Sequence, residues 1–260
     1  MRIVIKVGTS TLAHPGGRLN IRRIELMCKV LSDLKNAGYQ VVLVSSGAIG
    51  MGAGKLGLPG RPEDMTGKQA AAAVGQCELM YTYDKLFGEY DHTVAQILLT
   101  ADDVNDPHRS DYVHNTLERL LDWGVLPVVN ENDAVAIDEI GIHTTIGEND
   151  TLSAIVAKLL HADMLVLLSD IDGLYTSDPR KNPDATLIPQ VDAITPEILA
   201  LAGGTGSCLG SGGMATKLKA AQLAMDAGID MIITNGEHPE DLYALLEGSA
   251  IGTRFIGKKA

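Results

Sequence analysis

Short apolar runs rich in β-branched residues recur along the chain and alternate with longer segments of helical periodicity. The runs are apolar at nearly every position, which is typical of strands buried on both faces. Alternation of such strands with helices predicts a mostly parallel sheet between helical layers. We expect strands at 3–7, 41–44, 94–99, 125–129, 164–168 and 231–234.

Small, hydroxylated and acidic residues follow several of these strands. In open parallel sheets ligands bind at the carboxyl ends of the strands, so these residues are expected to share one edge and to form the functional site. The relevant segments are GTS at 8–10, SSGA at 45–48, NEND at 130–133 and SD at 169–170.

A glycine-rich segment at 203–213 leads into a helical pattern that carries Lys217. It contains six glycines within eleven residues, which lets backbone amides approach an anion beside a helix N-terminus. We interpret it as a phosphate-binding loop rather than a plain flexible connection. The segment does not fit GxxxxGK[ST], so a P-loop NTPase is disfavoured. A second glycine pattern, GxGxxG at 52–57, does not directly follow a strand, so we give little weight to it as a dinucleotide-binding motif.

Two charged residues allow opposite interpretations. Lys6 lies in the first strand, where it either extends to water or faces an anion at the strand end, and the adjacent GTS segment favours the anion. Asp150 either caps the helix that follows it or has a catalytic role. Together with 130–133, the turn at 147–150 offers one acidic clamp for a substrate ammonium and another group that orients lysines or metal.

Composition excludes several classes of protein. The formal net charge of −12 disfavours general binding to nucleic acid or membrane. The three cysteines are far apart and suggest neither disulfides nor a zinc cluster, and no signal peptide or membrane span is predicted, so we expect a cytoplasmic protein. Neither HExxH nor GxSxG is present, and no protein ligand for a metal is identified.

An ordered set of motifs resembles the glutamate-phosphorylating members of the amino acid kinase family, nearly end to end. The motifs are IKVGTS at 5–10, VSSGAI at 44–49, KQAAAAVGQ at 68–76, NENDAV at 130–135, DGLY at 172–175 and GGMATK at 212–217. The resemblance implies a three-layer α/β/α sandwich with a mainly parallel eight-stranded sheet. It also implies one domain over 1–260, with a glutamate-binding half at 1–171 and a nucleotide-binding half at 172–260.

The implied reaction is ATP-dependent phosphorylation of the side-chain carboxylate of L-glutamate to L-glutamyl 5-phosphate, the first step of proline biosynthesis. ATP would be the co-substrate, with Mg²⁺. The resemblance assigns catalysis to Lys6, Asp150 and Lys217, and glutamate binding to Ser46, Gly47, Asp133 and Asn149. It assigns nucleotide binding to Ser169, Asp170, Ser211, Gly212, Gly213, Met214, Ala215, Thr216 and Lys217.

The resemblance also implies feedback inhibition by L-proline and a homo-oligomer, either dimer or tetramer. Many relatives carry a C-terminal PUA domain, and since this sequence stops at Ala260 we expect a form without it. Ser169 replaces the usual threonine but keeps the hydroxyl. The alternatives are kinases of the same family that act on aspartate, acetylglutamate, carbamate or UMP, or a non-catalytic metabolite-binding regulator; retention of both lysines and Asp150 disfavours the regulator.

Overall fold

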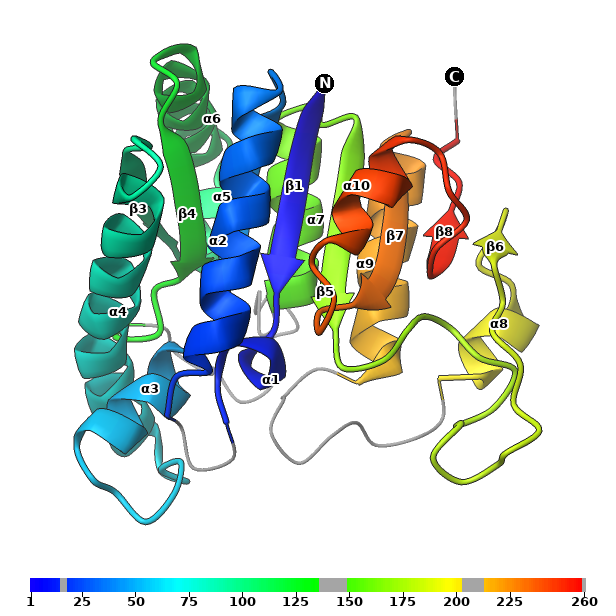
Figure 1. The fold of residues 1–260 in the computed structure, drawn as a ribbon, viewed down its shortest axis with the longest axis horizontal. Coiled ribbons are helices and arrows are strands. Elements are labelled where there is room, and N and C mark those ends of the chain that lie inside the picture. The colour runs from blue at the N-terminus through cyan, green and yellow to red at the C-terminus, as the bar shows by residue number, and fades with distance from the viewer. Residues whose placement is uncertain (15–17, 136–148, 203–212, 259–260) are drawn as a thin grey trace.

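The computed structural model describes residues 1–14, 18–135, 149–202 and 213–258, and these residues form a single sheet sandwiched between helices (Figure 1). The sheet of the described residues has eight strands in the order β3-β4-β2-β1-β5-β7-β8-β6. All neighbouring strands are parallel except β7 and β8, which are antiparallel. The predicted α/β class, with a mainly parallel sheet, is confirmed.

The strands are β1 (Arg2–Val7), β2 (Gln40–Ser45), β3 (Val94–Leu99), β4 (Leu126–Glu131), β5 (Met164–Ser169), β6 (Gln190–Val191), β7 (Asp230–Asn235) and β8 (Thr253–Phe255). The helices are α1 (Thr9–Leu12), α2 (Ile21–Asn36), α3 (Ala48–Lys55), α4 (Met65–Gly88), α5 (Ala101–Asn105), α6 (Pro107–Asp122), α7 (Asn149–Leu159), α8 (Pro196–Ala200), α9 (Met214–Asp226) and α10 (Asp241–Leu246).

Two buried apolar clusters hold the helical layers to the sheet. Side chains of α2, α4 and α10 pack on one face, and those of α6, α7 and α9 pack on the other. Figure 1 shows α2 and α10 in front of the sheet and α7 and α9 behind it. Because strand residues alternate between faces, Ile3, Ile5 and Val7 join the first cluster while Val4 joins the second.

The predicted strands are all present, with differences at their ends. Asn130 and Glu131 belong to β4, where they pair with Leu98 and Leu99 of β3, so they are not part of a turn after the strand as the sequence suggested. The short strands β6 and β8 were not located individually, because two or three residues are too few to show a period. Strands β1 to β5 all precede residue 172, but the division into glutamate-binding and nucleotide-binding halves stays a prediction.

Glycines let α3 and α4 cross at very short distance. A Cβ atom placed on Gly52 would lie 1.8 Å from the Ala71 carbonyl oxygen, and one on Gly75 would lie 1.8 Å from that of Ala48. The GxGxxG pattern at 52–57 therefore begins within a helix and serves helix packing. None of the helices in the described parts of the chain combines the length and hydropathy needed to cross a bilayer.

Candidate active site

Lys6 lies on the face of the sheet that α7 and α9 cover. It follows Val4 by two residues, which places both side chains on this face, and only 8% of Lys6 is exposed. Strand β1 lies between β2 and β5, with Lys6 opposite Val44 and Leu167, so this cation lies near the centre of the sheet. Burial of an ammonium group there requires a compensating negative charge.

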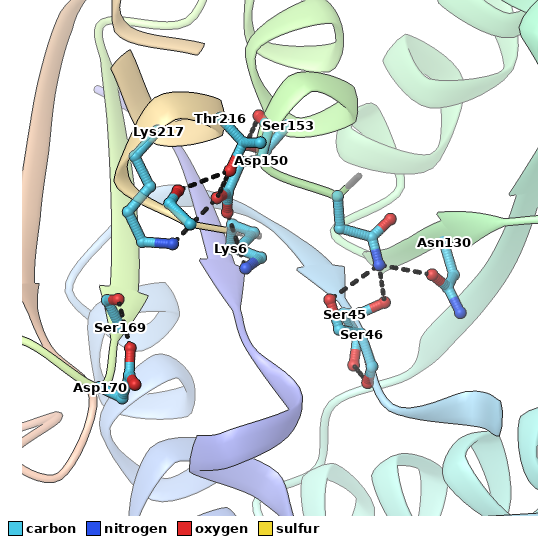
Figure 2. Close-up of polar contacts among 12 residues, drawn as sticks. Lys6, Ser45, Ser46, Asn130, Asp150, Ser153, Ser169, Asp170, Thr216 and Lys217 are labelled. Atoms are coloured by element: carbon cyan, nitrogen blue, oxygen red, sulfur yellow. Dashed lines mark hydrogen bonds and ion pairs between the residues drawn. The ribbon is translucent and has the colours of Figure 1, made fainter. Parts of the chain in front are cut away.

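Asp150, in the first turn of α7, provides that charge and binds a second lysine. Its Oδ1 atom lies 2.7 Å from Lys6 Nζ and its Oδ2 atom 3.0 Å from Lys217 Nζ. Lys217 comes from the first turn of α9, so residues distant in sequence meet at one carboxylate (Figure 2). Asp150 is the second residue of α7, so it is not the residue preceding the helix that the capping interpretation requires.

The two lysines keep this buried carboxyl ionised. Burial by itself opposes ionisation, but the opposite charges and hydrogen bonds of Lys6 and Lys217 outweigh it and lower the pKa of Asp150 to about 2. At neutral pH the group therefore holds two positive charges close together with one negative charge. The N-terminal ends of α7 and α9 add positive potential.

The start of α9 contains several of the predicted nucleotide-binding residues. Gly213 precedes the helix, and the hydroxyl of Thr216 lies 2.8 Å from the Gly213 carbonyl oxygen and 3.2 Å from Asp150 Oδ2. Met214 and Ala215 occupy the first positions of α9. Ser211 and Gly212 lie outside the described residues.

Ser169 and Asp170, the other predicted nucleotide contacts, lie at the carboxyl end of β5. The Ser169 hydroxyl donates to Asp170 Oδ1 at 3.2 Å, as Figure 2 shows, and Asp170 Oδ2 forms a 2.9 Å ion pair with Arg180. The Asp170 carboxylate is thus oriented by an arginine from the segment before β6. Sequence patterns did not indicate Arg180.

Asn149 lies beside Asp150 but contacts the opposite side of the site. Its Nδ2 group lies 3.2 Å from the Ser45 carbonyl oxygen, 2.8 Å from Ser46 Oγ and 2.9 Å from Asn130 Oδ1. Its Oδ1 atom is buried and has no hydrogen-bond partner among the described residues. Such an acceptor is costly unless a ligand donates to it.

The turn between β2 and α3 depends on Gly47. Its φ of 107° lies in the left-handed region, which residues with a side chain adopt only with strain. This conformation directs the chain from Ser46 into α3, placing the Ser46 hydroxyl next to Asn149. The predicted substrate residues Ser46, Gly47 and Asn149 are therefore brought together.

Asp133 lies beyond the end of β4 and lines a cavity of about 370 Å³. Gln76 of α4 and Gln96 of β3 line the same cavity, and neither was identified as a site residue from the sequence. Cys77 also lines it. The assignment of Asp133 to glutamate binding stays a prediction.

Tyr83 of α4 contacts Ser45, at the start of the Ser45–Ser46 segment. It is fully buried, and its hydroxyl lies 2.8 Å from Ser45 Oγ. We expect Tyr83→Phe to lower the free energy of unfolding by about 1 kcal/mol, and Ser45→Ala by about 1–3 kcal/mol because it leaves a buried phenol without its partner. Urea unfolding of both variants and of the double variant tests the pair; the double variant should lose less than the sum, and strict additivity would contradict the coupling.

Metal-binding side chains do not gather in the described parts of the chain: no three His, Cys, Asp or Glu side chains come together there as a metal site. Asp150, the carboxylate nearest the lysines, is already neutralised by them. Mg²⁺ commonly binds through substrate phosphates and water with few protein ligands. These residues therefore provide no dedicated metal cage.

Comparison with known proteins relates the chain to one family over most of its length. The Amino acid kinase family profile matches residues 1–235. A glutamate 5-kinase from Clostridium perfringens is 56% identical over 258 residues, 99% of this chain and 96% of that protein. One from Listeria monocytogenes is 54% identical, with coverage of 99% and 94%.

Solved structures share the fold at lower identity. An isopentenyl phosphate kinase from T. acidophilum superimposes with a TM-score of 0.69 at 24% identity, covering 98% of this chain and all of that one. A carbamate kinase from Giardia lamblia bound to AMP-PNP has a TM-score of 0.65 at 20% identity, with coverage of 99% and 98%.

Proposed function

The chain belongs to the amino acid kinase family, and on that premise we propose that it transfers the γ-phosphoryl group of ATP to the side-chain carboxylate of L-glutamate. The product is L-glutamyl 5-phosphate, and the reaction is the first step of proline biosynthesis. Two curated glutamate 5-kinases, more than half identical and matched over nearly the full chain, support this substrate. Since ATP and free glutamate are cytoplasmic metabolites, we place the protein in the cytoplasm.

One structural observation supports the chemistry above all. Asn149 and Asp150 are consecutive at the start of α7, yet Asn149 contacts Ser46 and Asp150 contacts the two lysines. A substrate held by Asn149 therefore lies next to the charges of Lys6 and Lys217, which would stabilise a transferring phosphoryl group. Figure 2 shows Lys6, Asp150 and Lys217 on one side and Ser45, Ser46 and Asn130 on the other.

The residues perform the reaction by positioning and charge. The acceptor carboxylate is ionised at neutral pH, so no general base is needed. The loose transition state spreads negative charge over the phosphoryl oxygens, and Lys6 and Lys217 stabilise it, while Asp150 keeps the two ammonium groups in place. Mg²⁺, bound mainly through nucleotide phosphates, would neutralise part of the ATP charge. Inhibition by proline and homo-oligomer formation stay predictions from the family resemblance.

ADP release with and without L-glutamate tests the proposal, with hydroxylamine added to trap the acyl phosphate as a hydroxamate. Turnover and hydroxamate should require L-glutamate. Parallel reactions with L-aspartate, N-acetyl-L-glutamate, carbamate and UMP cover the other activities of the family. ADP release that is independent of glutamate, or preference for another acceptor, would overturn the assignment.

Asp133 should affect glutamate far more than ATP. If its carboxylate binds the substrate ammonium, Asp133→Ala should raise the KM for glutamate about 10- to 150-fold by removing a charge-assisted hydrogen bond. The KM for ATP should change little. Asp122→Ala, which removes an exposed carboxylate at the end of α6, is the matched control. Equal changes in both KM values would contradict the role of Asp133.

A further inference from the structure

A chain of four side-chain amides runs from the edge of the sheet to the substrate side of the site. Gln96 of β3 accepts a 3.4 Å hydrogen bond from Gln76 of α4, and Gln76 Oε1 accepts one of 2.9 Å from Asn130 Nδ2. Asn130 Oδ1 then accepts a 2.9 Å bond from Asn149 Nδ2. Gln76 and Asn130 are only 8% and 1% exposed, so water reaches these bonds poorly.

Backbone groups determine which way each amide points. The Glu131 N–H can only donate, so the atom it meets at 2.9 Å must be Asn130 Oδ1. The amino group of Asn130 is therefore directed to Gln76. The Ser45 carbonyl can only accept, so it meets the amino group of Asn149. Asn149 must then present its carbonyl oxygen away from these partners, and this is the buried oxygen for which the described residues offer no hydrogen-bond partner.

Within the described residues, the Asn130 amino group donates its hydrogen bond to Gln76. Without this acceptor, Asn130 would leave a buried amino group unsatisfied and would gain by rotating toward another acceptor. Rotation would remove one of the three acceptors that hold the Asn149 amino group, leaving only Ser45 and Ser46 to fix its orientation. Gln76 also lines the cavity that contains Asp133.

We propose that Gln76 is a positioning residue that sets glutamate affinity by holding Asn130, and through it Asn149, with the Asn149 carbonyl oxygen directed at the substrate ammonium. The proposal rests on the proposed function, because it takes glutamate as the ligand. It predicts an effect on substrate binding and none on phosphoryl transfer, since the Lys6–Asp150–Lys217 group is outside the amide chain.

Steady-state kinetics of Gln76→Met and Gln76→Glu test the proposal. Methionine has a similar length but no strong acceptor, so the KM for glutamate should rise about 10- to 100-fold while kcat and the KM for ATP stay within about twofold. The Gln76→Glu side chain keeps an accepting oxygen in either protonation state, so this variant should retain most of the affinity for the substrate. Should Gln76→Met not fold, Gln76→Asn, with its oxygen one methylene short, should raise the same KM.

Two controls separate this role from a general packing effect. Gln190→Met makes the same substitution at an exposed glutamine of β6, away from the amide chain and the Asp133 cavity, and should leave both KM values unchanged. In an Asn130→Ala background the chain is already broken, so adding Gln76→Met should change the KM for glutamate by less than about twofold.

Side-chain hydrogen exchange of Asn149 in the protein without substrate provides a readout that needs no turnover. The resonance of its side-chain amide protons can be identified by its loss in Asn149→Asp. These protons should exchange at least about tenfold faster in Gln76→Met than in wild type, and at the wild-type rate in Gln76→Glu. If the wild-type protein does not phosphorylate glutamate but the Asn149 amide still exchanges faster in Gln76→Met, the proposed function is refuted and the positioning role is retained. Unchanged exchange and KM in Gln76→Met, or equal changes in kcat and the KM for ATP, would overturn the proposal.

Discussion

Lys217→Ala is expected to lower kcat about 100- to 1,000-fold, the typical cost of losing one preorganised donor to transition-state charge. Lys217 is held by Asp150 at 3.0 Å and is 6% exposed, so its position is set before substrate binds. The KM for glutamate should change much less, because Asn149 and Ser46 are on the other side of Asp150. Single-turnover measurement of phosphoryl transfer isolates this step from product release.

Lys219→Ala provides the matched control for Lys217. Lys219 lies two residues further along α9 and is exposed, so the same change in charge and helix propensity occurs away from Asp150. We expect wild-type kinetics for this variant. Near-normal turnover of Lys217→Ala, or an equal loss in both variants, would remove Lys217 from the mechanism.

Asp150→Asn is expected to reduce turnover about as strongly, because a neutral amide cannot hold two ammonium groups around an anion site. The change is nearly isosteric, so geometry alone does not account for a loss. A purely structural role of this polar side chain in the first turn of α7 therefore predicts unchanged turnover. Wild-type turnover would therefore return Asp150 to a structural role.

The same variant should lose stability, with a pH dependence that follows from the pKa of Asp150. Folding lowers this pKa from 3.8 to about 2, so the ionised carboxylate stabilises the fold above pH 4 and the effect is lost as pH falls toward 2. The shift corresponds to about 2 kcal/mol, or roughly 4–8 °C in Tm. Urea unfolding should show the difference between wild type and Asp150→Asn at pH 7 and its disappearance near pH 2. A difference independent of pH would contradict the electrostatic cause.

The sequence predicted the strands and the edge at which the site forms, because both depend on local pattern. Short, fully apolar runs such as 164–168 are typical of strands buried on both faces of a sheet. Residues at the carboxyl ends of parallel strands meet at one edge in any such fold, which is why the segments at 8–10, 45–48 and 169–170 were expected there together. The strand ends were less certain: Asn130 is polar, yet it continues β4 because Leu98 of β3 provides its hydrogen-bond partner.

The amide chain and the support beneath the site were beyond sequence reasoning. Nothing in the Ala-rich pattern around Gln76 distinguishes a buried glutamine from an exposed one, and Tyr83 reads as an ordinary apolar helix residue. Arg180 likewise gave no signal in a proline-rich segment. Each of these side chains acquires its role only from a partner that lies tens of residues away, such as Asn130, Ser45 or Asp170.

The sequence by itself determined the sheet and the helical layers, since hydrophobic periodicity is a property of local sequence, and its motifs named the charged residues that we propose for phosphoryl transfer. Only the tertiary structure decided how those charges pair. Lys6, Asp150 and Lys217 come from β1, α7 and α9, and their separations of 2.7 and 3.0 Å arise because packing brings the two helix ends over one strand. The favourable energy of a buried ion pair depends on distance and burial, which are set by packing between elements and not by the order of residues.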